Sequence, residues 1–205
     1  LITTYPSARA IANASQFKAN LVISQRPLFL WPIDRVTGAD EVRLRLILKN
    51  YMSVFVMGSP WIAAPDGLTD ALADVLGLDQ IRKFDTIGDT GSRVPIGRVC
   101  RAVDNMNHSS LINHIAGKLA LEEVVFTGDV DQEVEEVLVV AGSIVDMPEV
   151  IKARREGIRT LVTGELPPEV RLLAHEEGLN VIETREFYTE EPGMRRLYNY
   201  LSLQF

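Results

Sequence analysis

The second half of the chain alternates short apolar runs with amphipathic segments. The run Val137–Ala141 is continuous and rich in β-branched residues, which is typical of a buried parallel strand. The next segment opens with Asp146 as a helix cap, carries Pro148 in its first turn and reaches Gly157 where a left-handed cap belongs. The same cycle then repeats once. This pattern predicts strands at 137–141, 158–163 and 179–182, with helices at 146–157 and 167–178.

The first half follows the same plan, with predicted strands at 1–4, 21–24 and 53–57 and helices at 8–18 and 41–49. Leu21–Ser24 aligns with Thr160–Gly164, and Ala64–Leu68 before one helix aligns with Glu190–Met194 before another. We interpret this similarity as a duplication. It predicts an α/β fold of two similar lobes, residues 1–90 and 91–205, each with a parallel sheet.

The segment between the halves is less regular. Phe84–Pro95 is rich in Asp, Gly, Thr and Ser, which is typical of a loop or connection. After it we predict a strand over Gly97–Val103 and a serine-capped helix over Ser109–Leu119. Ligands of such sheets bind beyond the carboxyl ends of the strands. We therefore expect a cleft where the segments 24–27, 58–64, 164–168 and 184–190 converge.

Composition narrows the class of protein. The 205 residues are 46% hydrophobic and 24% charged, as in an ordinary globular protein, and the formal net charge of −7 argues against sequence-independent nucleic-acid binding. Cys100 is the only cysteine, which excludes an intrachain disulfide and favours a cytoplasmic location. We find no run of about 20 apolar residues that would span a membrane. The chain opens at Leu1 in a strand-like run without Met, so we expect a further segment upstream.

Short motifs over nearly the whole chain carry a resemblance to a known family. They are Leu21–Phe29, Ala63–Gly67, Ala71–Ala73, Leu76–Leu78, Gly97–Val99, Val139–Ser143, Thr163–Glu165, Tyr188–Glu190 and Pro192–Gly193. In this order and spacing the chain resembles the Nif-three-like dinuclear-metal-centre family, whose members are often named GTP cyclohydrolase 1 type 2 homologues. The resemblance implies a duplicated three-layer α/β/α fold with intertwined lobes. It also implies a ring-shaped homohexamer built as a trimer of dimers.

The resemblance also implies where a metal pair would lie. The family holds its metals on a His-His-Pro turn, on the Asp of a His-Thr-Asn-x-Asp segment, and on the His and Glu of a His-Tyr-x-Thr-Glu segment. Carried over position by position, the turn histidines become Gln25 and Arg26, and the aspartate becomes Ile62. In the last segment the histidine becomes Glu186, while the glutamate is kept as Glu190.

A guanidinium and an alkyl group cannot coordinate a metal, so we predict that the dinuclear site is lost and that no cofactor is needed. Glu186 and Glu190 could instead hold a divalent ion such as Mg²⁺, Mn²⁺ or Zn²⁺. The competing interpretation is a solvated acidic turn before a helix N-terminus. Arg26 could receive a small anionic ligand, or it could pair with Glu186 or Glu190 in place of the metals, which we favour.

Three further kinds of residue are secondary candidates. Glu165 follows a strand, where it could act as a catalytic carboxylate or cap the next helix. Trp61 could stack on a base or pack between lobes or subunits, as could Trp31 and Phe187. None of the histidines, His108, His114 and His175, falls on a ligand position of the family, so we expect them in surface or packing roles.

These observations leave two functions open. The first is a non-catalytic binding or scaffold protein that forms a homo-oligomeric ring, with a hexamer preferred. The second is a metal-dependent hydrolase of nucleotides, GTP cyclohydrolase-like or other, with a rebuilt site on Glu186, Glu190 and Glu165. The metal content of the purified protein distinguishes these two functions.

Overall fold

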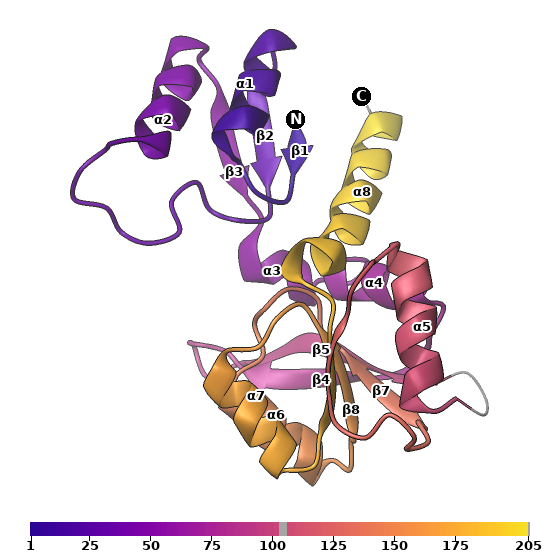
Figure 1. The fold of residues 1–205 in the computed structure, drawn as a ribbon. Helices are drawn as coiled ribbons and strands as arrows, with labels where there is room; N and C mark the ends of the chain where they lie inside the picture. The colour runs from indigo at the N-terminus through magenta and orange to yellow at the C-terminus, as the bar shows by residue number, and fades with distance from the viewer. Residues whose placement is uncertain (103–105, 205) are drawn as a thin grey trace. The chain divides into compact units, whose positions relative to one another are not determined.

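A computed structural model describes residues 1–102 and 106–204. It contains two sheets flanked by helices (Figure 1). The chain divides into two compact units: residues 1–61 with 194–205 form the first, and residues 62–193 form the second. The predicted α/β class is confirmed.

The first unit contains a three-stranded parallel sheet in the order β1–β2–β3. Its elements in chain order are β1 (Ile2–Thr3), α1 (Ala8–Gln16), β2 (Leu21–Ser24), α2 (Ala39–Lys49) and β3 (Ser53–Val56). Helix α1 begins after Ser7, whose hydroxyl accepts a hydrogen bond from the backbone N–H of Ala10 at 3.1 Å. Ile11 of α1, Val22 of β2 and Ile47 of α2 share one small buried cluster, so both helices cover the same face of this sheet.

The second unit contains a six-stranded mixed sheet in the order β4–β5–β7–β8–β9–β6. Its elements include α4 (Leu68–Leu76), β4 (Asp79–Ile87), β5 (Arg93–Arg101), α5 (His108–Leu119), β6 (Val125–Thr127), β7 (Glu136–Val139), α6 (Met147–Arg155), β8 (Thr160–Thr163), α7 (Pro168–Glu176) and β9 (Asn180–Glu183). Helix α3 (Gly58–Ala63) begins in the first unit and ends in the second, and α8 (Glu186–Gln204) begins in the second and ends in the first.

Strands β7, β8 and β9 are parallel neighbours in chain order, as are β1, β2 and β3. This shared order agrees with a duplication. The boundaries of the compact units nevertheless differ from those of the two predicted lobes. Strand β4 lies before residue 90 but pairs with β5, and the end of α8 belongs with the first unit.

The helix signals in the second half are confirmed. Asp146 and Glu149 form a capping box at the start of α6, and the chain turns after this helix with Gly157 at φ +83°. Helix α7 opens with Pro168 and is followed by Gly178 at φ +67°. Local cap chemistry therefore fixes where these helices begin and end.

Other expectations are corrected. The predicted loop 84–95 is mostly strand, because β4 and β5 form a hairpin. Helix α5 is capped by Asn107, whose side chain accepts from the N–H of Ser110 at 2.9 Å, rather than by a serine. Residue 103, at the end of the predicted strand 97–103, lies outside the described residues. Strand β6, which was not predicted, pairs antiparallel with β9.

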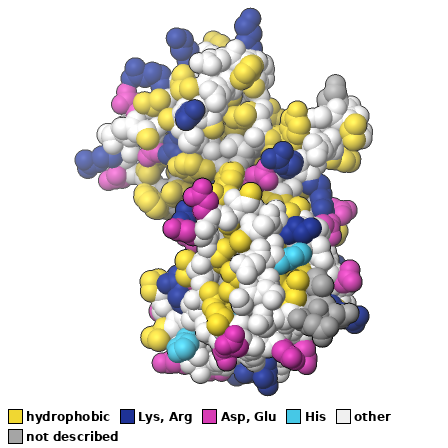
Figure 2. All heavy atoms as spheres, turned by 45° about the vertical axis from the view of Figure 1, so that its right-hand side comes forward, with side chains coloured by type: hydrophobic (Ala, Val, Ile, Leu, Met, Phe, Trp, Pro, Cys, Tyr) yellow, Lys and Arg dark blue, Asp and Glu magenta, His cyan; other side chains and the backbone are white. Residues whose placement is uncertain are grey.

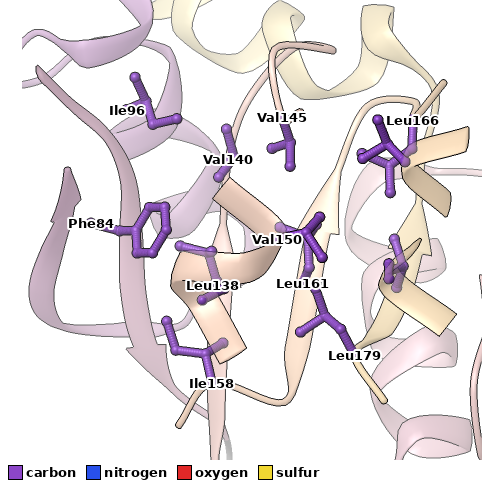
Figure 3. Packing of buried hydrophobic residues seen from close by; sticks show 14 of the residues in the cluster. Phe84, Ile96, Leu138, Val140, Val145, Val150, Ile158, Leu161, Leu166 and Leu179 are labelled. Atoms are coloured by element: carbon purple, nitrogen blue, oxygen red, sulfur yellow. The ribbon is translucent and has the colours of Figure 1, made fainter. Parts of the chain in front are cut away.

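The main core of the second unit lies between its sheet and helices α6 and α7, which lie on the same side of the sheet in Figure 1. Figure 3 shows Leu138 of β7 and Leu161 of β8 beside Val150 of α6. Phe84 of β4 closes one end of the cluster, and its ring is fully buried. Burial of such side chains is the largest favourable term in folding.

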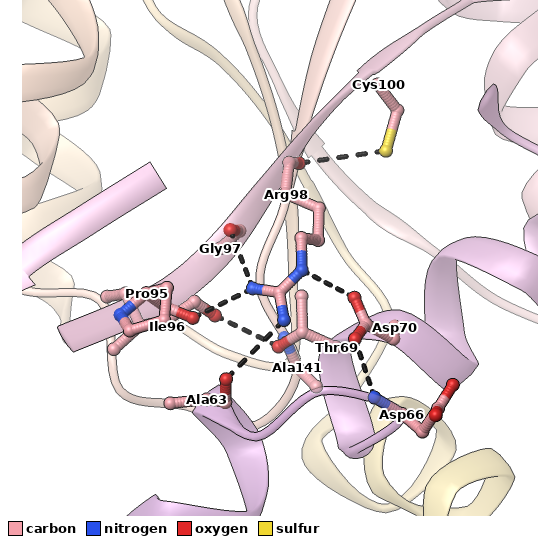
Figure 4. Close-up of polar contacts among 10 residues, drawn as sticks. All are labelled: Ala63, Asp66, Thr69, Asp70, Pro95, Ile96, Gly97, Arg98, Cys100 and Ala141. Atoms are coloured by element: carbon pink, nitrogen blue, oxygen red, sulfur yellow. Dashed lines mark hydrogen bonds and ion pairs between the residues drawn. The ribbon is translucent and has the colours of Figure 1, made fainter. Parts of the chain in front are cut away.

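A buried polar network holds α4 against β5 (Figure 4). The side chain of Arg98 is 1% exposed, and its Nε lies 2.5 Å from Oδ1 of Asp70. Its Nη1 donates to the carbonyl oxygens of Pro95 and Gly97 at 2.8 and 3.0 Å. The Thr69 hydroxyl donates to the carbonyl oxygen of Ile96 at 2.9 Å. The buried charge is thus paired and hydrogen-bonded, as burial requires.

Candidate functional site

Hydrogen bonds tie the loop after β7 to the end of β8 and to the start of α8. The N–H of Gly164 donates to the carbonyl oxygen of Gly142 at 2.9 Å, and the Thr163 hydroxyl donates to the same oxygen at 3.0 Å. The N–H of Gly142 donates in turn to the Thr189 hydroxyl of α8 at 2.9 Å. Thr189 therefore joins the first turn of α8 to the end of β7. The sequence prediction missed this residue.

Gly164 is required where the loop after β8 meets α8. A Cβ atom placed on it would lie 2.7 Å from the carbonyl oxygen of Gly142 and 3.0 Å from Cα of Glu186. Both contacts are with backbone atoms, which cannot give way easily. The beginning of α8 therefore packs directly on the end of β8.

Glu186 and Glu190 both lie in α8, which corrects the predicted turn before a helix. The helix begins at Glu186 and continues through Pro192, whose missing N–H leaves the carbonyl of Tyr188 without its usual helical partner. Glu190 is 1% exposed, so it is not part of a solvated turn, and Glu186 is half-buried. A buried carboxylate requires hydrogen-bond donors or a positive charge nearby. Glu190 is therefore a candidate site residue.

Ile62 lies in α3 and is 2% exposed. The carbonyl oxygen of the next residue, Ala63, accepts from Nη2 of Arg98 at 3.5 Å. Position 62 thus carries a buried alkyl side chain, and the residue after it contacts the buried side chain of Arg98.

Gln25 and Arg26 follow β2 in the first unit. Gln25 is buried, and its Nε2 donates to the carbonyl oxygen of Gly58 at 3.0 Å. Among the described residues its Oε1 has no hydrogen-bond partner, and the same is true of Nε1 of Trp61. Buried polar atoms of this kind are normally satisfied, so the two atoms mark places for a bound molecule or water.

The five inherited positions are divided between the units: Gln25 and Arg26 lie in the first, and Ile62, Glu186 and Glu190 lie in the second. Their convergence on one site, and the pairing of Arg26 with a carboxylate, stay predictions.

Glu165 does not cap α7. It is exposed, its N–H donates to the Ser143 hydroxyl at 3.0 Å, and the cap position Pro167 offers no side-chain hydrogen bond. The carboxylate of Glu183, at the end of β9, accepts from the N–H of Leu166 at 2.8 Å and from Nε of Arg171 at 2.6 Å. This bond raises the pKa of Arg171. Glu183, which the sequence prediction missed, therefore orders this loop.

Comparison with known proteins decides the family. The family described as Duf34/NIF3 (NGG1p interacting factor 3) matches residues 1–205. The chain belongs to the Duf34/NIF3 family. A Clostridium perfringens relative of this family, named GTP cyclohydrolase 1 type 2 homolog, is 24% identical over 184 residues, which are 89% of this chain and 69% of the relative.

Solved structures of NIF3-like proteins share the fold. A Bacillus cereus protein related to NIF3 superposes with a TM-score of 0.82 at 15% identity, over 99% of this chain and 83% of that one. The Staphylococcus aureus protein SA1388 gives a TM-score of 0.80 at 19% identity, over 100% of this chain and 80% of that one. The resemblance of the sequence to this family is confirmed.

The residues of this NIF3-family chain do not fit a dinuclear metal centre. Ile62 offers only a buried alkyl group, and Nε2 of Gln25 donates a hydrogen bond to the carbonyl oxygen of Gly58. Arg26 offers a guanidinium group, which cannot coordinate a metal ion. In the part of the chain that the structure describes, no three His, Cys, Asp or Glu side chains are grouped to hold a metal ion.

The histidines of this NIF3 chain lie apart from the inherited positions. His108 begins α5 and is fully buried, with Nδ1 2.9 Å from the carbonyl oxygen of Gln132 and Nε2 2.9 Å from the Thr160 hydroxyl. His114 lies in α5, and His175 is exposed at the end of α7. The structural role that we expected for His108 is confirmed by these bonds.

His108 should make the NIF3 chain less stable in mild acid. Burial lowers the pKa of His108. As the pH falls through about 6.5, the unfolded chain takes up a proton that the folded chain does not, so the free energy of unfolding falls by up to about 1.4 kcal/mol per pH unit. Urea unfolding of the wild type between pH 7 and 5 measures this slope.

The variant His108→Gln should be less stable at pH 7 but should lose this part of the pH dependence. His175→Gln, at an exposed position of the same chain, should keep it. Equal slopes for the wild type and His108→Gln would contradict the assignment.

Proposed function

We propose that this chain is a non-catalytic, ring-forming binding or scaffold protein that has lost the dinuclear metal site of its family. The observation that carries the proposal is Ile62, a buried alkyl side chain at the position of a carboxylate ligand. Gln25 and Arg26 support it, because neither replaces an imidazole as a metal ligand.

Binding is supported by two of the buried polar atoms that have no hydrogen-bond partner among the described residues of the first unit. Gln25 Oε1 would accept a hydrogen bond, and Trp61 Nε1 would donate one. A small polar ligand that carries both a donor and an acceptor would satisfy them. An anionic group on that ligand would suit the permanent charge of Arg26.

Homo-oligomer formation, with a hexamer preferred, is supported by apolar side chains on the surface. Phe17, Tyr51 and Leu203 are each more than four-fifths exposed, at 83, 89 and 85%. Figure 2 shows apolar side chains lying among charged ones of both signs. Closed symmetric assembly is the usual way to cover such surface.

A cytosolic location forms part of the proposal. Its support is that Cys100 is the only cysteine of the sequence and is unpaired, as is usual for proteins of a reducing compartment. Burial raises the pKa of its thiol to about 12, which makes the thiol unreactive. Among the described helices, none is long and apolar enough to cross a membrane.

The alternative is a metal-dependent hydrolase, and the observation that favours it is the buried carboxylate of Glu190. With Glu186 in the same helix, it could hold one Mg²⁺, Mn²⁺ or Zn²⁺ ion, which would polarise a substrate oxygen or a water molecule. The name of the C. perfringens relative is compatible with nucleotide hydrolysis.

Metal content tests the proposal. Protein purified without chelator should contain far less than one Mn, Fe, Zn or Ni ion per chain by plasma mass spectrometry. Replacing Arg26→His together with Ile62→Asp should raise the bound metal, because it returns one imidazole and one carboxylate. The matched control is Arg35→His with Val36→Asp, at exposed positions.

Stoichiometric metal in the wild type would overturn the proposal and favour the hydrolase. Because Ile62→Asp places a charge at a buried position, Arg26→His alone is measured as well, and circular dichroism establishes that each variant is folded. The wild-type measurement decides by itself.

A further inference from the structure

Strand β4 is a long open edge of the second unit's sheet. It is nine residues long and pairs, among the described residues, only with β5. Such an edge presents unpaired N–H and C=O groups and is a template for another strand. Charged side chains and two register shifts against β5, between Gln80 and Arg82 and between Phe84 and Thr86, protect this edge from random association.

The side chains of β4 are divided between its two faces. Arg82, Phe84 and Thr86 face α6: Arg82 pairs with Glu156 at 2.7 Å, the Thr86 hydroxyl bonds Glu149, and Phe84 lies in the core. The alternate residues face the other way. Of these, Ile81 is 44% and Ile87 67% exposed, Lys83 is exposed and Asp85 is half-buried.

A groove of about 520 Å³ follows this strand. Its lining includes Lys83, Asp85 and Ile87 from one face, Arg82 and Thr86 from the other, and four residues of α6 and its C-cap, Pro148, Glu149, Lys152 and Glu156. The groove is thus lined by residues of both faces of β4, together with Arg93 of β5, which pairs with Ile87.

The exposed face of β4 is complementary to itself. About Phe84, the residues one place away are Lys83 and Asp85, and the residues three places away are Ile81 and Ile87. When two antiparallel copies meet on a two-fold axis at Phe84, Lys83 lies opposite Asp85 of the second copy. Ile81 then lies opposite Ile87 of the second copy.

We propose that β4 pairs with β4 of a second copy of this chain, with Phe84 on the two-fold axis, so that two six-stranded sheets join into one. The axis position follows from charge. An axis at Lys83 would set that lysine against itself, and an axis at Asp85 would do the same with the carboxylate. This inference rests on the homo-oligomer of the proposed function and names the surface that forms it.

A charge exchange tests the pairing. Lys83→Asp and Asp85→Lys, made singly, each place like charges opposite each other at both symmetric pairs. Each should raise the dissociation constant of the two-fold contact at least tenfold, measured by sedimentation between 1 and 100 μM. The double variant restores opposite charges and should return within about threefold of the wild type.

Lys118→Asp, at an exposed position of α5, is the matched control and should leave the mass distribution unchanged. Circular dichroism and urea unfolding show that each variant is folded. A wild type that sediments as a 22.8 kDa monomer would overturn both the proposed assembly and this contact.

Two further outcomes distinguish the β4–β4 contact from the proposed homo-oligomer as a whole. An oligomeric wild type whose mass is unchanged by either single reversal would overturn the β4 contact and leave the proposed oligomer standing. If the single and double variants all dissociate, the edge is used but the axis at Phe84 is wrong.

Discussion

Asp70→Ala should be among the most destabilising single changes in this chain, lowering the free energy of unfolding by about 3–5 kcal/mol. The change leaves the Arg98 guanidinium, whose side chain is 1% exposed, buried without its carboxylate partner. It also removes the acceptor for the N–H of Asp66, which Oδ2 of Asp70 binds at 2.8 Å. Urea unfolding monitored by circular dichroism measures the loss.

Asp89→Ala, in the exposed turn between β4 and β5, is the control and should stay within about 0.5 kcal/mol of the wild type. Arg98→Met together with Asp70→Leu should recover much of the loss, because replacing both partners by apolar groups leaves no buried charge unpaired. A loss below 1 kcal/mol for Asp70→Ala would show that the pair contributes little.

Gly164→Ala should lower the free energy of unfolding by about 1–3 kcal/mol. The added methyl group would lie 2.7 Å from the carbonyl oxygen of Gly142, so either the loop after β8 or the start of α8 must move. Because the methyl would also meet Cα of Glu186 at 3.0 Å, amide exchange should speed up in the first turn of α8.

Gly117→Ala is the matched control. Gly117 lies within α5, where an added Cβ would meet no atom within 4 Å, so alanine should stabilise the helix by about 0.5–1 kcal/mol. Equal effects at Gly117 and Gly164 would contradict the close approach that we describe.

The helices that the sequence predicted well are those whose capping residues lie close together in the sequence. Asp146, Glu149 and Gly157 lie within a dozen residues of one another, and they define α6 without help from the rest of the chain. Membership of the family could likewise be predicted, because motif order survives substitution of individual residues.

The hairpin of β4 and β5 was missed because an edge strand carries polar residues. Thr86 lies in the predicted loop 84–95, yet in the structure its hydroxyl bonds Glu149 of α6. Arg82 of the same strand pairs with Glu156 on the same face. Such partners lie more than 60 residues away in the sequence, so composition in a local window could not reveal them.

Pro192 and Gly193 misled the prediction of α8 for a different reason. Their composition predicts the boundary before a helix, but Gly193 is needed for packing: a Cβ there would lie 2.7 Å from Cα of Leu68. The burial of Glu190 depends in the same way on tertiary neighbours, and so does Oε1 of Gln25, which has no hydrogen-bond partner among residues 1–102 and 106–204. A motif gives the position of a residue but not its surroundings.

The residues of the second unit are synthesised in one continuous stretch, whereas those of the first unit are synthesised in two separate stretches. The second unit is one continuous stretch, residues 62–193, and its whole sheet has been synthesised before residue 194 is added. The first unit combines residues 1–61 with residues 194–205, so its strands emerge before the second unit but its last residues emerge after it. During synthesis residues 1–61 are therefore made before the second unit but their unit is completed after it.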